Sequence, residues 1–224
     1  MSPFQPGMTP GRLRSALVIA LSMTLVAVSY GSLSHDVGML PWQTVLLALF
    51  VYGGASELLF VSALAGGAPI PSAALAGLVV NSRNFAYAMN VGSFFPTGWR
   101  RIFGAHLIHD ESMAFGRIGS TKEERWNNFR FIGVLLLFCW VGGALVGQVL
   151  AGMVDTSALG LDAAFPVILV AMVFDELRRH STLPFAIFGA LIAIAATPFV
   201  PAGLGGVAAL AAIVPWMLVE RKSS

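Results

Sequence analysis

A short group of polar residues stands inside a long apolar region of the sequence, at 81–90. It reads Asn-Ser-Arg-Asn-Phe-Ala-Tyr-Ala-Met-Asn, and the only charged residue between Asp36 and Arg83 is Glu57. An arginine at the centre of a membrane-spanning helix costs roughly 2.5–3.5 kcal/mol on insertion scales. Such residues usually face the interior of a helix bundle or a water-filled path. We therefore interpret this stretch as part of the wall of a polar path through a membrane protein.

A helix over 81–90 would have two unlike faces, because successive residues are rotated by about 100°. Phe85 and Met89 fall on the apolar half. The polar half would offer hydrogen bonds and one fixed positive charge to an anionic group, and its members are Asn81, Arg83, Asn84, Tyr87 and Asn90. A structural role also stays open, in which the asparagines join helices and Arg83 is neutralised by Glu57 or Asp110.

Ionisable residues at 57 and 106–111 are candidates for carrying a proton or for meeting a substrate ammonium group. His106, His109 and Asp110 have the i, i+3, i+4 spacing of one helix face. That spacing suits a proton relay or a face in contact with lipid headgroups and water. A metal site is disfavoured, because no third His or Cys ligand and no His-Glu-x-x-His pattern is evident. Our candidate coupling residues are Glu57, His109, Asp110 and Glu111, although Glu111 should point about 100° away from Asp110 on a helix.

The composition requires a membrane environment for these groups. Of the 224 residues, 57% are hydrophobic and 11% are charged, with a mean hydropathy of +0.80, whereas a soluble domain has about 25% charged residues. The net charge of +2 reflects basic loops and does not indicate nucleic-acid binding. Cys139 is the single cysteine, which excludes an intrachain disulfide. No nucleotide-binding Gly-rich loop is present, and we expect neither a cofactor nor enzymatic activity.

We predict an all-α polytopic membrane protein, with a disordered tail at 1–11 and a single transmembrane domain over 12–224. At about 20 apolar residues per crossing, the chain could supply roughly seven or eight spans, some of them short or broken. The spans expected in the first 154 residues are 15–34, 42–65, 71–95, 102–118 and 131–154. Further on, 163–174 is a short apolar run and 181–219 is long enough for two short spans.

The placement of Lys and Arg predicts the orientation. With eight crossings most of the thirteen basic residues fall on one side, and Arg100 and Arg101 fall on the other. The positive-inside rule then puts both termini in the cytoplasm. If 102–118 re-enters instead of crossing, the count becomes seven and one end changes side. The pair Asp175-Glu176 follows an apolar run as Asp110-Glu111 does, which would suit corresponding parts of a structural repeat.

Four short motifs, in their order and spacing, resemble the AzlC family of branched-chain amino-acid permeases over nearly the whole chain. They are Gly54-Ala55-Ser56 with a polar residue next, Asn81-Ser82-Arg83-Asn84 followed by an aromatic residue, Asp110-Glu111-Ser112, and Gly160-Leu161-Asp162. Through the first motif, Ser56 joins the substrate-binding candidates. The chain departs from the family pattern at Glu57, Asn84 and His109, where the family often has glutamine, histidine and threonine.

The resemblance implies a multi-pass protein of the bacterial inner membrane that exports branched-chain amino acids with a small separate membrane partner of the AzlD type. In that interpretation Arg83 would hold the substrate carboxylate of valine, leucine or isoleucine, and the asparagines would add hydrogen bonds. Two alternatives stay open. One is an intramembrane enzyme that uses His106, His109 and Asp110, and the other is a scaffold subunit whose partner carries the activity.

Overall fold

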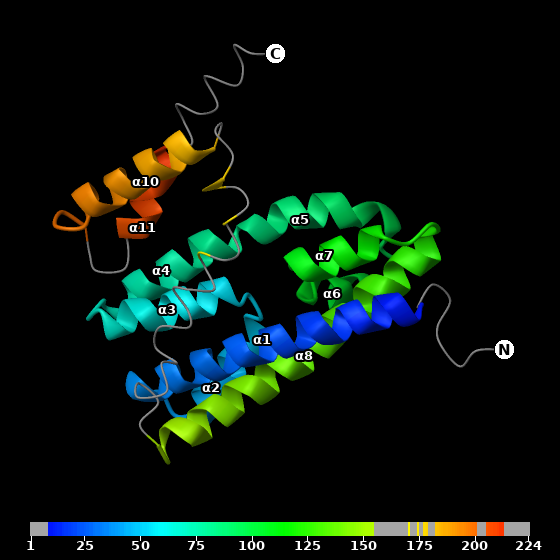
Figure 1. The fold of residues 1–224 in the computed structure, drawn as a ribbon, viewed down its shortest axis with the longest axis horizontal. Helices are drawn as coiled ribbons and strands as arrows, with labels where there is room; N and C mark the ends of the chain where they lie inside the picture. The colour runs from blue at the N-terminus through cyan, green and yellow to red at the C-terminus, as the bar shows by residue number, and fades with distance from the viewer. Residues whose placement is uncertain are drawn as a thin grey trace, which may run out of the picture.

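The computed structural model describes residues 9–154, 170, 174, 177–178, 182–200 and 205–212. Within these ranges every regular element is a helix, as predicted (Figure 1). Helix α10 (Leu183–Ala196) packs with the short α11 (Gly205–Ala208) and the 3-10 turn η2 (Ala209–Ala212). The Asp175-Glu176 pair, the motif at 160–162 and the predicted span at 163–174, apart from 170 and 174, lie outside the described residues. The total of seven or eight spans therefore stays a prediction.

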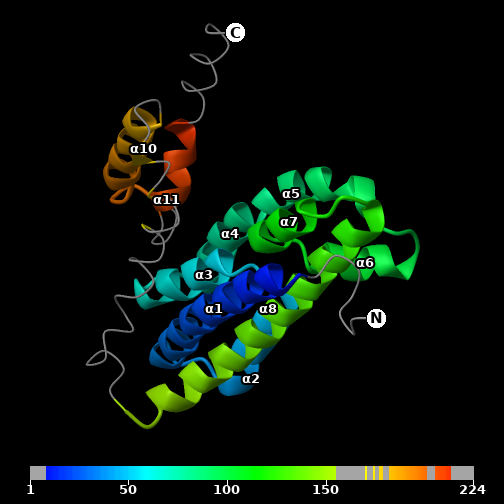
Figure 2. The same cartoon turned by 45° about the vertical axis from the view of Figure 1, so that its right-hand side comes forward.

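Among the described residues, two helices are long and apolar enough to cross a membrane: α1 (Pro10–Asp36) and α8 (Lys122–Ala151). Helix α1 begins inside the predicted tail, because Thr9 caps it and Pro10 suits a first turn. The two helices run side by side in the same direction (Figures 1 and 2). Gly143 of α8 meets Thr24, and Gly147 meets Val28 one turn further along both helices. Gly143 and Gly147 have the Gly-x-x-x-Gly spacing that lets two helices approach closely, and this face of α8 lies against α1.

Helices α2 (Pro41–Phe50) and α3 (Ala55–Ala65) form a re-entrant hairpin. Gln148, near the end of α8, donates a hydrogen bond to the carbonyl of Met39 just before α2 (2.6 Å). Tyr52, which follows α2, donates a hydrogen bond to the carbonyl of Gly133 (2.8 Å). Gly133 lies partway along α8, so α2 does not extend the full length of that helix. Helix α3 then runs back toward the end of the bundle at which α2 begins (Figures 1 and 2). The prediction that 42–65 crosses is therefore wrong, because residues 51–54 interrupt the helix and reverse the chain.

Helices α4 (Ile70–Asn81) and α5 (Arg83–Val91), with the 3-10 turn η1 (Gly92–Phe94), carry the chain back along the whole bundle. Gly77 of α4 packs on Ser56 in α3. At the far end, Phe95 stacks edge-on against Trp126 near the start of α8, with ring centroids 5.4 Å apart. The segment 71–95 is therefore helical over most of its length, with an interruption at Ser82, and its role as a membrane span stays a prediction.

Helices α6 (Trp99–His106) and α7 (Asp110–Arg117) form a second re-entrant hairpin, which enters from the other end. Gly104 packs on Trp126 near the start of α8, Leu107 packs on Gly133, and Gly116 returns to Phe129. The segment 102–118 therefore re-enters and does not cross, which corrects the eight-crossing arrangement. The shared helix face predicted for His106, His109 and Asp110 is also wrong, because α6 ends at His106 and a new helix begins at Asp110.

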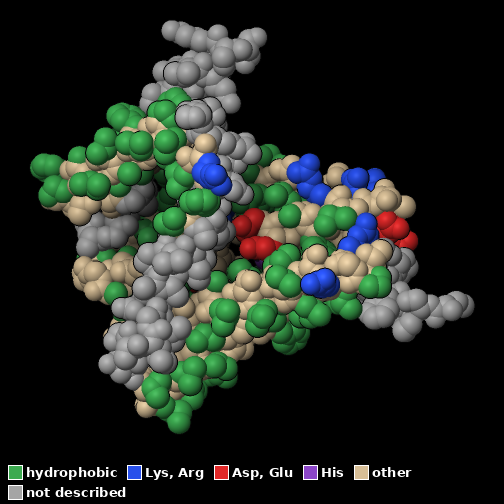
Figure 3. Space-filling model, in the orientation of Figure 1, with side chains coloured by type: hydrophobic (Ala, Val, Ile, Leu, Met, Phe, Trp, Pro, Cys, Tyr) green, Lys and Arg blue, Asp and Glu red, His purple; other side chains and the backbone are tan. Residues whose placement is uncertain are grey.

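This topology brings the basic residues of 9–154 to one end of the bundle, which we call the basic end (Figure 3). Arg83 is the exception, near mid-bundle. The residues at the basic end are Arg12, Arg14, Arg100, Arg101, Arg117, Lys122, Arg125 and Arg130. The placement of Arg100 and Arg101 on the opposite side is thus wrong. The loops 37–40, 66–69 and 152–154 at the other end contain no Lys or Arg.

Candidate functional site

Three helix interruptions meet partway along α8: the hairpin tips at 51–54 and 107–109, and the break at Ser82. The hydroxyl of Tyr52 lies 2.9 Å from Nε2 of His109, which joins the two tips. The side chain of Asn81, just before the break, lies against Gly53. Interrupted helices leave backbone N–H and C=O groups without helical partners. Within a membrane bundle such groups are tolerated only when buried in protein or lining a cavity.

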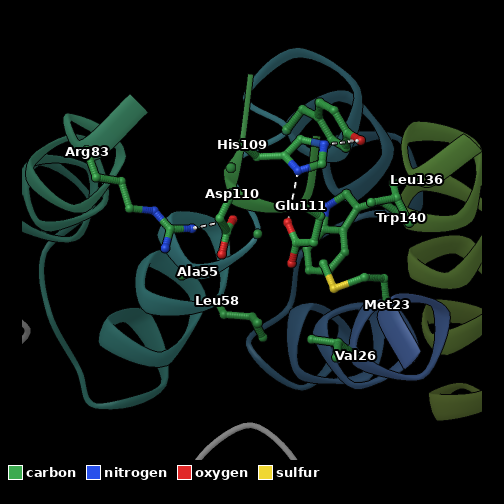
Figure 4. Close-up of a pocket in the computed structure, with 13 residues that line it drawn as sticks. Met23, Val26, Ala55, Leu58, Arg83, His109, Asp110, Glu111, Leu136 and Trp140 are labelled. Carbon is green, nitrogen blue, oxygen red and sulfur yellow. Dashed lines mark hydrogen bonds and ion pairs between the residues drawn. The ribbon is translucent and has the colours of Figure 1, made fainter. Parts of the chain in front are cut away.

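A cavity of about 60 Å³ lies at this junction (Figure 4). One wall is polar and contains Arg83, His109, Asp110 and Glu111, with the backbone of Gly53 and Gly54. The other wall is mainly apolar and contains Met23, Val26, Leu58, Leu136 and Trp140. Figure 3 shows acidic side chains in a hollow on one face of the molecule, between hydrophobic side chains. The site therefore combines charges of both signs with an apolar surface.

Glu57 serves as an internal cap of the first tip. It is only 1% exposed. Its Oε2 accepts hydrogen bonds from the backbone N–H groups of Gly53 and Gly54, both at 2.9 Å, and its Oε1 accepts one from the indole of Trp140 at 3.2 Å. These bonds satisfy donors that the helix interruption exposes. Glu57, one of the two counter-ions predicted for Arg83, therefore does not pair with it.

Arg83 is paired with Asp110, the other predicted counter-ion. The closest distance, from Nη2 to Oδ1, is 3.8 Å, and each side chain is about one-third exposed. The guanidinium also lies 5.9 Å from the ring centre of Tyr87. Nε of Arg83 is buried and has no hydrogen-bond partner in the described chain. A contact of 3.8 Å is an ion pair without a hydrogen bond, so the guanidinium has donors available for another anion.

His109 and Glu111 form a closer pair next to Arg83 and Asp110. Nδ1 of His109 lies 2.9 Å from Oε2 of Glu111 and also faces the backbone N–H of Ser112, which His109 caps. One possible ligand atom from each of His109, Asp110 and Glu111 lies within 4.8 Å of the others. The expected separation of the two acids is therefore wrong. We assign no metal to this set, because each group already has a partner in the described chain.

Two of the remaining predicted site residues, Asn81 and Asn84, lie on either side of the break at Ser82. Asn81 and Asn84 are hydrogen-bonded to each other (2.9 Å) and line a second cavity of about 390 Å³, together with Tyr52 and His106. Phe85 and Met89 are 78% and 80% exposed, as the helical projection predicted.

Three predicted substrate-binding residues do not line either cavity. Asn90 is exposed and bonds the carbonyl of Ala86 in its own helix. The hydroxyl of Ser56 is buried without a partner. Tyr87 contacts Arg83 and reaches the first cavity only through it.

Two residues of the site were missed by sequence reasoning. Tyr52 touches both cavities and both hairpin tips. Its signal was a tyrosine directly before Gly53-Gly54 in an apolar run. Trp140 donates to Glu57 from inside α8, and a buried indole N–H generally needs an acceptor. Pairing the mid-span Trp with the mid-span Glu was therefore possible from the sequence.

The fold defines a class: a helical membrane protein in which interrupted helices meet at a polar site inside the bundle, an arrangement found in transporters. Residues 18–154 match the family model described as "AzlC protein", and the chain belongs to the AzlC family. This confirms the resemblance that the sequence motifs indicated.

Curated relatives agree with this assignment. An "Uncharacterized membrane protein" of Helicobacter pylori (strain ATCC 700392 / 26695) is 26% identical over 179 residues, 79% of this chain and 78% of its own length. The "Branched-chain amino acid transport protein AzlC" of Bacillus subtilis (strain 168) is 24% identical, over 70% of this chain and 65% of its own length. The "Inner membrane protein YgaZ" of Escherichia coli (strain K12) is also 24% identical, with 72% and 65% covered. No solved structure matches the chain.

Proposed function

We propose that the protein exports branched-chain amino acids across the bacterial inner membrane, and that the substrate binds in the cavity between the hairpin tips. Such a substrate has a carboxylate, an ammonium group and an aliphatic side chain. The cavity offers Arg83 to the carboxylate and Asp110 to the ammonium group. The wall with Met23, Leu58 and Leu136 suits the aliphatic side chain.

The observation that carries this proposal is the loose pair between Arg83 and Asp110. Their 3.8 Å separation exceeds the roughly 2.7–2.9 Å of a charge-assisted hydrogen bond. A zwitterion placed between the two side chains would therefore replace one long contact with shorter bonds at both of its charged ends. The free Nε of Arg83 supplies a further donor for the carboxylate.

The cavity must widen for a substrate to enter. Its volume of about 60 Å³ is well below the roughly 300–1,000 Å³ of pockets that hold drug-sized ligands. We propose that the hairpin tips separate and that the path continues into the second cavity, where Asn81 and Asn84 offer hydrogen bonds. In this scheme Tyr87 positions Arg83, and Ser56 and Asn90 are assigned no direct contact with the substrate.

The orientation and the partner complete the proposal. The positive-inside rule places the basic end, and with it the N-terminus, in the cytoplasm. A small AzlD-type membrane protein is proposed as the partner on the ground of the family resemblance. The outward Phe85 and Met89 of α5 suit contact with lipid or with such an apolar partner.

Efflux of labelled valine and leucine from cells that lack this protein tests the proposal. The cells are complemented with wild type, Arg83→Ala or Arg83→Lys, each with and without the small partner. We expect Arg83→Ala to reduce efflux by about 10–100-fold, the equivalent of one or two hydrogen bonds to a charged group. Arg83→Lys should retain part of the activity, since it keeps the charge and loses the fork of donors.

Arg101→Ala is the matched control, because Arg101 is an exposed arginine at the basic end. It should leave efflux within about twofold of wild type, as expected for an exposed charge. Immunoblots of membranes show whether each variant is present at the normal level. Normal efflux from the Arg83→Ala strain would rule out the role of Arg83 as substrate clamp.

A further inference from the structure

A chain of hydrogen bonds joins α8, the first hairpin tip and the second hairpin tip. It runs from the carbonyl of Gly133 to the hydroxyl of Tyr52 (2.8 Å), then to Nε2 of His109 (2.9 Å). It ends with Nδ1 of His109 beside Oε2 of Glu111 (2.9 Å). Tyr52 and His109 are buried, whereas Glu111 lines the cavity and is partly exposed. The chain thus connects the cavity to one of the contacts that tie the α2–α3 hairpin to α8, and Figure 4 shows its His109–Glu111 part.

The protons in this chain can be counted, because a tyrosine hydroxyl has one hydrogen and a carbonyl oxygen only accepts. Tyr52 must use its hydrogen on Gly133, so its oxygen accepts from His109 and Nε2 is protonated. Another proton is needed between Nδ1 and the Glu111 carboxylate, since two acceptors would otherwise face each other at 2.9 Å. The intact chain therefore requires His109 and Glu111 to hold two protons together, with no net charge on the pair.

Removing one of these protons changes the contact of Tyr52. The remaining proton stays between Nδ1 and Glu111, where it bonds a carboxylate, and leaves Nε2 without a hydrogen. The Tyr52 hydroxyl must then rotate to donate to Nε2, and the carbonyl of Gly133 loses its donor. Deprotonation of the His109–Glu111 pair thus breaks the Tyr52–Gly133 bond between the tip of the α2–α3 hairpin and α8, while the bond from Trp140 to Glu57 remains.

The backbone of Tyr52 is held under strain at this contact. Its φ is 44°, and it is the one non-glycine residue of the described chain with a positive φ. A bulky residue adopts this conformation only where its surroundings hold it in place. Loss of the bond to Gly133 removes one of the contacts that hold Tyr52 in this conformation. Relaxation of its backbone then favours movement of the tip.

Other charged and titratable groups surround the chain, among them Asp110, which interacts with Glu111, and His106, whose ring centre lies 5.8 Å from that of Tyr52. They are Tyr30 on α1, Glu57 on α3, Arg83 and Tyr87 on α5, His106 on α6, Asp110 on α7 and Cys139 on α8. Glu57 is engaged as a cap, and Asp110 is paired with Arg83. Glu111 and His109 both line the cavity, so water that reaches it can exchange a proton with this pair.

We propose that His109 and Glu111 together bind the single proton that couples transport, and that Tyr52 relays its presence to the α2–α3 hairpin. This inference rests on the proposed function. A substrate ammonium held by Asp110 lies close to the pair, whose ligand atoms are within 4.8 Å of that carboxylate. The positive charge disfavours the extra proton, so substrate and proton bind alternately. Proton entry on one side then drives amino-acid exit on the other.

Two transport assays on purified protein and its small partner in proteoliposomes test this coupling. The first measures exchange of labelled valine with valine on both sides and equal pH. The second measures valine accumulation driven by an imposed pH gradient, together with the signal of an entrapped pH dye. Wild type should perform both reactions, and in the second it should move protons in the direction opposite to valine. Exchange without proton movement in wild type would overturn the coupling alone, whereas absence of exchange would overturn the proposed function.

The variants are Glu111→Gln, His109→Asn and Tyr52→Phe, of which asparagine keeps a good helix N-cap at 109. Glu111→Gln and His109→Asn should lower gradient-driven accumulation by at least about tenfold more than they lower exchange, because the pair no longer holds the proton. Tyr52→Phe should reduce the number of protons moved per valine exported. Gradient-driven transport with normal proton movement in Glu111→Gln would overturn the proposal. Loss of exchange in a folded His109→Asn protein would also overturn it, since it would place His109 in substrate binding.

Discussion

The two re-entrant hairpins enter the bundle from opposite ends and carry different kinds of tip. The tip of α2–α3 is made of backbone: Gly53 and Gly54 present N–H groups, and Glu57 turns back to accept from both. The tip of α6–α7 is made of side chains: His109 caps the helix, and Asp110 and Glu111 face the cavity. Each hairpin therefore places carboxylates at the first turn of its second helix, where the helix dipole favours an anion.

The difference teaches how a buried acid in a membrane protein can be classified by its hydrogen bonds. Glu57 has three short bonds to donors that need it, and its removal would leave those donors buried. Asp110 has one ion pair at 3.8 Å and borders a cavity. An acid that satisfies its own helix end acts as structure, whereas an acid with spare capacity beside a cavity is available for a ligand.

The largest expected effect separates these two acids by the same substitution at both tips. Glu57→Ala leaves three donors without an acceptor: the N–H of Gly53 and the indole N–H of Trp140 are buried, and the N–H of Gly54 is partly buried. At about 1–3 kcal/mol for each buried donor, we expect a loss of at least about 2 kcal/mol in stability. Asp110→Ala removes a partly exposed pair and should change stability by no more than about 1 kcal/mol. It should nevertheless reduce valine efflux by about tenfold or more. Thermal unfolding in detergent and the efflux assay measure the two effects.

Opposite results would invalidate the distinction between the tips. A Glu57→Ala protein as stable as wild type would show that the three bonds contribute little. An unfolded Asp110→Ala protein would make the second tip structural as well. Glu57→Gln provides a finer comparison, because one amide oxygen can still accept while its NH₂ group faces donors.

A smaller effect is expected at Gly54, where the first tip depends on backbone conformation. Its φ is +58°, and an added Cβ would meet no other atom. The cost of Gly54→Ala is therefore conformational, and we expect a stability loss of roughly 1–3 kcal/mol. Gly142→Ala in α8 is the matched control, since its Cβ would also meet nothing, in a helical backbone. It should be neutral or stabilising by up to about 1 kcal/mol. Equal unfolding temperatures for the two variants would contradict the strained tip.

The smallest effect concerns the direction from which each hairpin enters. In a Cys139→Ser background, single cysteines at Arg101, Thr121 and Leu40 are exposed to labelling and should each change efflux by less than about twofold, as surface substitutions do. A membrane-impermeant maleimide should label positions 101 and 121 from the same side, and position 40 from the other. Labelling of 101 and 121 from opposite sides would mean that 102–118 crosses the membrane after all.

The class and part of the site could be predicted because they depend on composition and on local periodicity. Such patterns predicted the all-helical membrane fold and the outward position of Phe85 and Met89. They also named Asp110 as one of two candidate partners for Arg83. The hairpins could not be predicted, because two half-length apolar helices have the same length and composition as one crossing helix. Between His106 and His109, Leu107 and Ile108 end a helix without any Gly or Pro signal, so a spacing that suited one helix face was divided between two helices.

The glycine contact between α1 and α8 has a consequence for how the chain is made. A Cβ at Gly31 or Gly147 would collide with the backbone of the opposite helix, so each helix offers its partner a surface of bare backbone. Gly147 follows Gly31 by 116 residues, which a ribosome adds in about 6–23 s at roughly 5–20 residues per second. During that interval α1 lies in the membrane without its partner, while both hairpins are inserted. Helix α8 is therefore the last helix of this part of the bundle to be made, and a chain stopped before it would lack the contacts of both hairpin tips with α8, namely those of Tyr52 and Leu107 with Gly133.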